Sequence, residues 1–144
     1  MKHIEVVAGI IEYNGKILCM QRDKGKFDYV SYKWEFPGGK IEVGETKEEA
    51  LRRELKEEME LEVDVLGHLI DVYHEYPDFT MNMYCFKCVA KTDKFLLNVH
   101  HDFKWLKLDE LKTLDWAPAD MPIVEKLQTE ISKNQKKGNL KWKF

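Results

Sequence analysis

The chain has 144 residues, a hydrophobic content of 44% and a net charge of −3 at pH 7, which together predict one soluble globular domain. The negative balance gives no electrostatic reason to expect binding to a nucleic-acid polymer or to an anionic membrane. The N-terminal apolar run is short and contains Glu5, so it predicts neither a signal peptide nor a membrane span, and we expect a cytoplasmic protein.

The first part of the chain predicts a β-hairpin and a loop. His3–Tyr13 is rich in β-branched and apolar residues, and Asn14–Gly15 separates it from the similar run Lys16–Arg22. An Asn-Gly pair between two such runs is a strong signal for a two-residue type I′ turn. Residues 23–33 are charged and aromatic without periodicity, so they predict a flexible loop.

A short strand is expected at Trp34–Phe36, and Pro37–Gly38–Gly39 should end it. Glycine permits tight turning and close approach of the backbone, which a metal or phosphate site beside the turn would need. Thr46 and Glu49 then form a capping box, so a helix is expected to begin there.

This helix is dense in glutamate. At 100° per residue, three of its glutamates fall within an arc of roughly 100°, and an apolar stripe beside them would hold the helix against a core. Like-charged pairs at these spacings each destabilise a helix by about 0.2–0.5 kcal/mol. A divalent cation would remove the repulsion, and oxygen ligands suit Mg²⁺ or Mn²⁺. The glutamates are Glu54, Glu57 and Glu58, and the stripe is Leu51, Leu55 and Met59.

The same glutamates also fit a different interpretation, a solvated surface with salt bridges. Arg53 is spaced to pair with both Glu49 and Glu57 on such a surface. The helix alone therefore leaves both alternatives open.

Two long strands are expected next, at Leu61–Tyr76 and Phe79–Ala90, joined at Pro77–Asp78. Both alternating faces of the second strand carry large side chains, which is typical of a sheet covered on both sides. Cys85 and Cys88 are an odd number of residues apart, so they should point to opposite faces. This argues against a zinc or redox pair, and with Cys19 the chain has three cysteines that we expect to be free thiols.

The last part of the chain predicts a polar connection at 91–102, a strand at Phe103–Leu108 and a short helix at Asp109–Leu114. Pro122 fits the first turn of a final helix that runs to about Lys133.

The order of these elements predicts an α/β fold with a mixed sheet between helices. Residues 1–134 should form a single domain, followed by a basic and aromatic tail at 135–144 that we expect to be loosely held.

The spacing of residues from Gly39 to Leu61 resembles the Nudix box, G-x5-E-x7-R-E-U-x-E-E-x-G-U, where U is aliphatic. Matches at so many fixed offsets make this resemblance specific. Glu60 departs from it, because the family usually has glycine there, just past the helix end. A non-glycine residue in the left-handed conformation would cost about 1–2 kcal/mol at that position. The matching residues are Gly39, Glu45, Arg53, Glu54, Leu55, Glu57, Glu58 and Leu61.

This resemblance implies an α/β/α sandwich and a Mg²⁺-dependent hydrolase, with Mn²⁺ as a possible substitute. Such enzymes use water to cleave a nucleoside diphosphate linked to another group. The resemblance implies that Glu54, Glu57 and Glu58 bind the metal, with the backbone carbonyl of Gly39 nearby. It gives Arg53 the role of orienting these catalytic carboxylates.

A further metal ligand is left open by the resemblance. Many relatives place a carboxylate six residues before a tryptophan, and this chain has Val99 at that position. Asp102, His100 or His101 could take its place, although a surface role is the alternative for either histidine.

Residues outside the box look like the MutT and CTP pyrophosphohydrolase branch, whose members cleave nucleoside triphosphates to a monophosphate and pyrophosphate. By this resemblance Arg22, Phe36, Lys40 and Asp120 would bind the substrate, and Trp34 is a further candidate. Trp34 and Phe36 could equally be core residues. The runs that carry the resemblance are Ile4–Ile11, Gln21–Arg22, Trp34–Lys40 and Ala117–Asp120.

Asp120 stands where relatives specific for 8-oxo-dGTP carry an asparagine. Asparagine donates and accepts hydrogen bonds, whereas an ionised aspartate only accepts them. Asp120 therefore favours an exocyclic amine such as cytosine N4, and it favours cytosine nucleotides over strict use of 8-oxo-dGTP. The alternative is that Asp120 caps the helix at Pro122.

We therefore expect a Mg²⁺-dependent nucleoside triphosphate pyrophosphohydrolase that acts on free nucleotides as a monomer or weak homodimer. One alternative is a hydrolase of ADP-ribose or another nucleoside diphosphate derivative, which would usually be longer. Another is a nucleotide-sensing module without catalysis, but this chain retains the box glutamates that such a module would be expected to lack.

Overall fold

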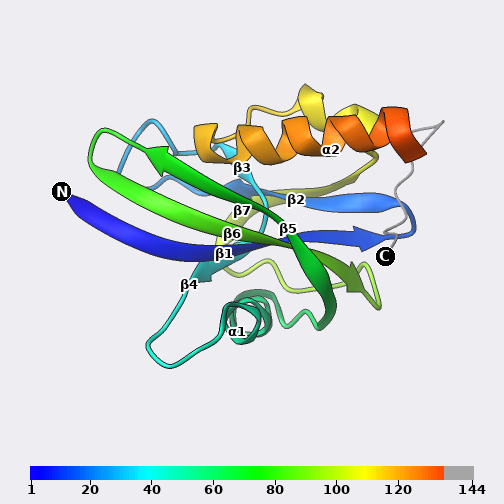
Figure 1. Ribbon diagram of the computed structural model, residues 1–144, viewed down its shortest axis with the longest axis horizontal. Coiled ribbons are helices and arrows are strands. Elements are labelled where there is room, and N and C mark those ends of the chain that lie inside the picture. The colour runs from blue at the N-terminus through cyan, green and yellow to red at the C-terminus, as the bar shows by residue number, and fades with distance from the viewer. Residues whose placement is uncertain (135–144) are drawn as a thin grey trace.

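A mixed β-sheet lies between two helices in the computed structural model, which describes residues 1–134 (Figure 1). This is the predicted α/β/α arrangement, and the predicted tail at 135–144 lies outside the described residues. Neither helix in residues 1–134 has the length and apolar character needed to cross a membrane. The elements are β1 (Lys2–Tyr13), β2 (Lys16–Arg22), β3 (Trp34–Glu35), β4 (Gly38–Lys40), α1 (Lys47–Met59), β5 (Val63–Glu75), β6 (Phe79–Ala90), β7 (His100–Leu106) and α2 (Met121–Asn134), with 3₁₀ segments at Leu108–Thr113 and Pro118–Asp120.

The sheet is built around β1, which pairs with β2, β4 and β6. Its strand order is β3-β2-β1-β6-β5, with β4 added beside β1 and β7 beside β2. β1 runs parallel to β6, from the Lys2–Phe79 pair to the Glu12–Val89 pair, while the other pairings are antiparallel. The parallel pair joins two antiparallel halves, and this makes the sheet mixed.

The hairpin between β1 and β2 forms as predicted. Asn14 and Gly15 both have positive φ, at 52° and 80°, which is the signature of a type I′ turn. The Glu12 carboxylate accepts a hydrogen bond from the Gly15 N–H, which holds the turn closed.

Pro37–Gly38–Gly39 ends β3 as predicted, but Gly38 and Gly39 also begin a further strand, β4, which the sequence did not predict. Gly38 lies opposite Ala8, and Gly39 lies opposite Val7. A Cβ atom on Gly38 would lie 1.9 Å from the Val7 carbonyl oxygen, so only glycine allows the two backbones to approach this closely.

β7 begins at His100, three residues before the predicted start. Its first residues are polar, which hid the strand in the sequence, but they pair with β2 up to the Arg22–His100 pair. A β-bulge between Gln21 and Arg22 shifts the register just before this pair.

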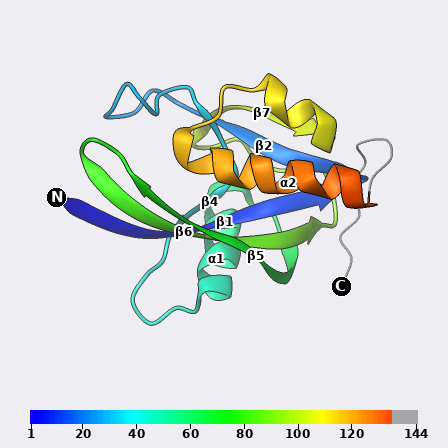
Figure 2. The ribbon, with the colours of Figure 1, turned by 45° about the horizontal axis from the view of Figure 1, so that its top comes forward.

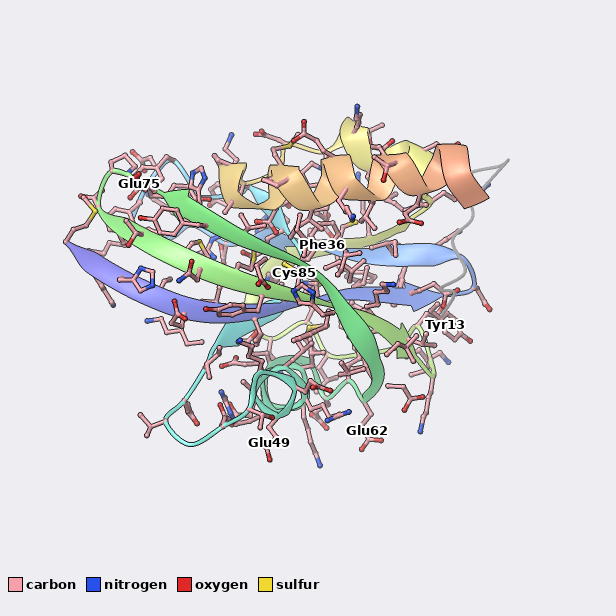
Figure 3. All side chains as sticks on the ribbon, viewed as in Figure 1. Tyr13, Phe36, Glu49, Glu62, Glu75 and Cys85 are labelled. Atoms are coloured by element: carbon pink, nitrogen blue, oxygen red, sulfur yellow. The ribbon has the colours of Figure 1, made fainter. Side chains whose placement is uncertain are left out.

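The core has two layers, one on each face of the sheet. α2 and the 3₁₀ segments cover one face, and Figure 2 shows α2 lying across the strands. α1 covers the other face with Leu51, Leu55 and Met59, the stripe predicted from the sequence. Figure 3 shows side chains filling both spaces, with Phe36 and Cys85 between the sheet and α2 and Glu49 pointing outward from α1.

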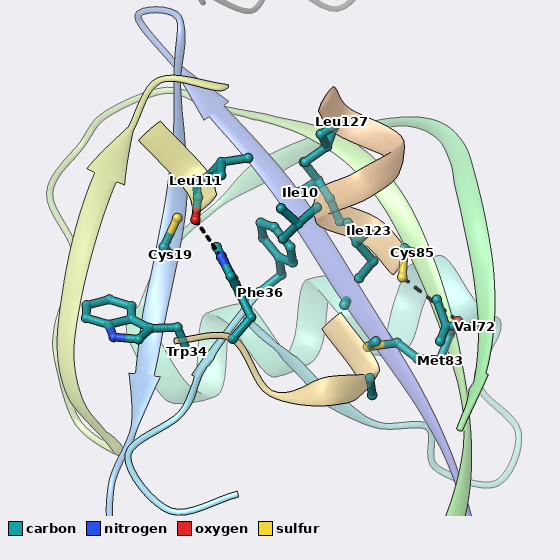
Figure 4. Close-up of a cluster of buried hydrophobic side chains, with 14 of the residues drawn as sticks. Ile10, Cys19, Trp34, Phe36, Val72, Met83, Cys85, Leu111, Ile123 and Leu127 are labelled. Atoms are coloured by element: carbon teal, nitrogen blue, oxygen red, sulfur yellow. Dashed lines mark hydrogen bonds between the residues drawn. The ribbon is translucent and has the colours of Figure 1, made fainter. Parts of the chain in front are cut away.

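The three cysteines are free and buried, as predicted. Cys85 lies in the layer under α2 and Cys88 in the layer under α1, so the two thiols are on opposite faces of β6. Figure 4 shows Cys19 and Cys85 among the apolar side chains of the α2 layer.

The capping box predicted at the start of α1 is present, and the helix ends at Glu60, which adopts the left-handed conformation. Thr46 Oγ1 accepts from the Glu49 N–H, and the Glu49 carboxylate accepts from the Thr46 N–H. Glu60 has φ 49° and ψ 38°. Its N–H donates to the Lys56 carbonyl, and Leu61 N–H donates to the Leu55 carbonyl, which is the Schellman arrangement.

Replacing Glu60 with glycine should stabilise the protein, because glycine adopts this conformation without a steric penalty. We expect the free energy of unfolding of Glu60→Gly to rise by about 1 kcal/mol in urea denaturation. Glu62→Gly is the matched control, since Glu62 is exposed and does not have positive φ; it should be neutral or destabilising. A loss of stability in Glu60→Gly would show that Glu60 makes contacts worth more than its backbone strain.

Candidate active site

A cavity of about 610 Å³ brings together most of the residues that the sequence singled out. Its wall includes Gly39, Lys40 and two of the α1 glutamates, Glu54 and Glu58. Apolar side chains of β1 and β6 form another part of the wall. The cavity also contains Arg22, Glu35, Phe36, Tyr76, His100 and Asp120.

Arg53 organises the carboxylates beside this cavity. Its Nη1 donates to Glu54 at 3.1 Å and to Glu57 at 3.2 Å. Its Nε and Nη2 donate to the Glu45 carboxylate, whose pKa is lowered mainly by these bonds. Nη2 also donates to the Lys40 carbonyl at 3.0 Å, which ties α1 to β4.

The alternative interpretation of these glutamates, a solvated surface with salt bridges, is only partly correct. Arg53 pairs with Glu57 as that alternative proposed, but the Glu49 carboxylate bonds the Thr46 backbone instead. The Arg53 and Glu54 side chains are 21% and 13% exposed, so this is not a freely solvated face.

Glu54 and Glu58 crowd each other at the cavity wall. Burial, together with a hydrogen bond from Glu58 to Glu54 and the charge of Glu54, raises the pKa of Glu58 to about 7. The Glu54 carboxylate lies against the backbone of Gly39, where a Cβ atom would be 2.4 Å from it. Two carboxylates are therefore held close enough to share a proton.

The donor set fits a hard divalent cation, although residues 1–134 contain no group of three acidic, His or Cys side chains already arranged around one point. The donors are all oxygens, which Mg²⁺ and Mn²⁺ prefer. A cation can take the place of the proton between Glu54 and Glu58, and the missing side chain of Gly39 leaves room beside them. Glu57, with a side chain that is 62% exposed, is held near by Arg53.

The segment 99–102 contributes two residues to the cavity, Val99 and His100. A surface role for His100 is wrong, because its side chain is only 7% exposed and its Nε2 donates to Glu35 at 2.9 Å. His101 is 53% exposed, and Asp102 accepts a hydrogen bond from the N–H of Phe103. The structure does not bring these last two residues to the cavity wall.

Asp120 reaches the cavity from the segment before α2 and is 4% exposed. Its Oδ1 accepts a hydrogen bond from the Phe36 N–H at 3.0 Å, so it links this segment to the β3–β4 connection, whereas the alternative considered from the sequence was a cap of the final helix. Burial is the main cause that raises the pKa of Asp120 well above its ordinary value, and the charge of Glu35 adds to it.

Of the two aromatic candidates, the structure brings Phe36 but not Trp34 to the cavity. The Phe36 ring stacks on Trp116 with centroids 4.6 Å apart, which covers one of its faces. Trp34 packs in the α2 layer, because its backbone N–H donates to the Asp115 carbonyl and its carbonyl accepts from Ala117.

Sequence reasoning missed Glu35 and Tyr76. Glu35 binds both Arg22 Nη1, at 3.1 Å, and His100. The only local signal in the sequence was its position as an acidic residue between two aromatic residues of a predicted strand. Tyr76 Oη accepts a hydrogen bond from the Ala119 N–H, and burial raises the pKa of Tyr76 to about 12. No local pattern indicated that Tyr76 would meet a segment 43 residues away.

The chain is similar in sequence and in fold to known proteins. The NUDIX domain family matches residues 1–127. The CTP pyrophosphohydrolase of Escherichia coli is 35% identical over 125 residues, which cover 87% of this chain and 91% of that protein. The 8-oxo-dGTP diphosphatase of the same organism is 29% identical over 128 residues, which cover 89% of this chain and 98% of that protein. The solution structure of MutT from Staphylococcus aureus is 41% identical with a TM-score of 0.70, covering 90% of this chain and 99% of that one.

Alanine substitutions at the two glycines of β4 should affect different properties, stability at Gly38 and cation binding at Gly39. In Gly38→Ala the new Cβ meets the backbone of Val7 and Ala8, so we expect a loss of at least about 1–3 kcal/mol in the free energy of unfolding.

In Gly39→Ala the new Cβ meets the flexible end of Glu54, which can rotate away, so stability should change little. Displacement of Glu54 should weaken Mn²⁺ binding, measured by electron paramagnetic resonance, by about tenfold or more. Unchanged Mn²⁺ affinity in Gly39→Ala would argue against a cation site beside Gly39.

The raised pKa of Asp120 predicts how stability depends on pH. The folded state binds this proton more tightly than the unfolded state does. The contribution of Asp120 is therefore fully present below the unfolded pKa of about 3.9 and is lost as pH rises through the folded pKa. Asp120→Asn removes this titration, so its free energy of unfolding relative to wild type should increase with pH above about 4, by up to about 1.4 kcal/mol per unit.

Urea denaturation across this pH range measures that difference. Asp109→Asn is the control, because Asp109 is exposed in a 3₁₀ segment, and its difference from wild type should stay nearly constant. A constant difference for Asp120→Asn as well would show that Asp120 is ionised in the fold.

Proposed function

The chain belongs to the Nudix family of hydrolases, and from this premise we propose that it is a nucleoside triphosphate pyrophosphohydrolase. It converts a nucleoside triphosphate and water to a nucleoside monophosphate and pyrophosphate. The E. coli relatives named as CTP pyrophosphohydrolase and 8-oxo-dGTP diphosphatase support this activity, since the chain covers more than nine tenths of each of them.

One observation carries the proposal: the acidic end of α1 and the Phe36–Asp120 pair open into the same cavity. Carboxylates that hold a cation are needed at the phosphates, while an aromatic ring and a buried polar group suit a base. The cavity volume of about 610 Å³ lies within the range of small-ligand sites. A nucleotide can therefore place its phosphates and its base against different parts of one wall.

Nudix hydrolases generally need a divalent metal such as Mg²⁺. In this chain Glu54, Glu57 and Glu58, with the Gly39 carbonyl, would hold it. When bound, the metal neutralises phosphate charge and lowers the pKa of a coordinated water. Arg53 keeps Glu54 and Glu57 in place through its Nη1 bonds, so the protein does not have to reorganise its carboxylates during the reaction.

Of the basic residues on the cavity wall, we assign Arg22 and Lys40 to the phosphate end of the site. Lys40 is exposed and follows the glycines of β4, so its ammonium group is free to meet the phosphates. Arg22 is held by Glu35 and is therefore more rigid.

At the base end, Asp120 and Phe36 are the groups that we assign to base binding. A preference for cytosine nucleotides would require an ionised Asp120, but burial favours the protonated form. A protonated carboxyl group both donates and accepts hydrogen bonds, as the asparagine side chain does. We therefore propose that both cytosine nucleotides and 8-oxo-dGTP are substrates, in agreement with the names of the two relatives.

A pyrophosphate-release assay with Mg²⁺ tests this function across CTP, dCTP, 5-methyl-dCTP, dGTP, 8-oxo-dGTP and ADP-ribose. We expect turnover of cytosine triphosphates and 8-oxo-dGTP, none without metal, and no cleavage of ADP-ribose. Glu57→Gln should lower kcat by more than about 100-fold, because it weakens the cation site without disturbing the exposed surface of α1.

Glu48→Gln is the matched control, since Glu48 is an exposed glutamate of the same helix and does not line the cavity. It should retain wild-type turnover. Near-normal turnover in Glu57→Gln, or cleavage of ADP-ribose alone, would contradict the proposal.

A further inference from the structure

Three polar side chains form a cluster between the edge strands of the sheet, and the proposed function uses only one of them. The cluster is Arg22 on β2, Glu35 on β3 and His100 on β7. Arg22 and His100 are direct partners in the β2–β7 ladder. Glu35 joins them, since its Oε1 lies 3.1 Å from Arg22 Nη1 and its Oε2 lies 2.9 Å from His100 Nε2.

Arg22 and His100 each have one buried nitrogen atom without a hydrogen-bond partner in the described part of the chain. Arg22 Nε and His100 Nδ1 are both inaccessible to solvent and make no hydrogen bond within residues 1–134. The His100 side chain as a whole is 7% exposed. Buried polar atoms are nearly always paired in folded proteins, so two unpaired nitrogens on neighbouring residues of the ladder indicate a partner that the protein itself does not supply.

The surroundings of the cluster indicate what kind of partner this is. All three residues line the same cavity as Glu54 and Glu58 of the acidic site. The cluster therefore shares its cavity with the carboxylates beside which the phosphate chain of a nucleotide would lie. Arg22 Nε–H can only donate, and an imidazolium donates from both ring nitrogens. Adjacent donors of this kind match anionic oxygen atoms.

We propose that His100 is a substrate-binding residue whose Nδ1–H donates to a phosphate oxygen of the nucleotide, beside Arg22 Nε–H. Glu35 is a positioning residue, because it binds another nitrogen of each side chain and so fixes how the two unpaired nitrogens are oriented. This inference rests on the proposed function, because a nucleoside triphosphate is the ligand that supplies the phosphate.

Two substitutions at His100 separate its nitrogens. The amide of glutamine can take the place of Nε2 and keep the bond to Glu35, while the amide of asparagine is placed closer to Nδ1. We expect His100→Gln to lower kcat/KM for the best triphosphate by about 10- to 100-fold, mainly through KM. His100→Asn should lose less, because it keeps a donor towards the phosphate.

Glu35→Gln and His68→Gln complete the kinetic series. Glu35→Gln keeps the shape of the side chain but weakens its hydrogen bonds to Arg22 and His100. KM should therefore rise, while the unfolding midpoint stays near that of the wild type. His68 also pairs with a carboxylate, Asp71 at 2.6 Å, but does not line the cavity, so His68→Gln should behave as wild type. Wild-type KM in His100→Gln, or a larger loss in His100→Asn than in His100→Gln, would overturn the assignment of Nδ1.

Nuclear magnetic resonance of protein labelled with ¹⁵N-histidine tests the contact without turnover. Inorganic tripolyphosphate should shift the His100 Nδ1 resonance, identified by its loss in His100→Gln, whereas cytidine should not. A shift with cytidine alone would place the contact at the sugar or base, and no shift with either would remove His100 from the site. Because this titration needs no catalysis, it keeps failure of the His100 proposal distinct from failure of the proposed hydrolase activity.

Discussion

The guanidinium group of Arg53 is the interaction on which the acidic site depends. It binds carboxylates from the loop before α1 and from α1 itself, and it also binds the carbonyl of Lys40 at the end of β4. Without a cation at this point, the carboxylates of Glu45, Glu54 and Glu57 would repel one another and the helix would lose its attachment to β4. A single side chain thus determines which way these acids point, and it adds a polar link to the apolar packing that holds α1 against the sheet.

The backbone of β4 is the second constraint, because it sets how closely the helix can approach the sheet. Gly38 permits contact with β1, and Gly39 leaves space that the Glu54 carboxylate occupies. The two glycines therefore have different physical roles, one between backbones and one between backbone and side chain. Their neighbour Lys40 supplies the carbonyl that Arg53 binds, so β1, β4 and α1 form one connected unit.

Features governed by a few neighbouring residues were predictable from the sequence. The hairpin at Asn14–Gly15 and the capping box at Thr46 are of this kind, and the fixed offsets of the Nudix box were equally informative. β4 and the burial of His100 were not predictable, because each depends on a strand that is distant in the chain. Trp34 and Phe36 looked equivalent in sequence, and only their backbone partners separate them: Trp34 is fixed to the segment at 115–117, while Asp120 holds Phe36 at the cavity.

The hydrogen bond between Asp120 and Phe36 joins residues 84 positions apart, and this separation has a consequence during synthesis. A ribosome that has released the first ninety residues has already produced α1 and its local contacts. The segment that carries Asp120 has not yet been made, so the Phe36 N–H lacks its partner at that stage. The cavity wall that we assign to base binding can therefore close only after residues 118–120 have followed, later than the synthesis of the acidic helix.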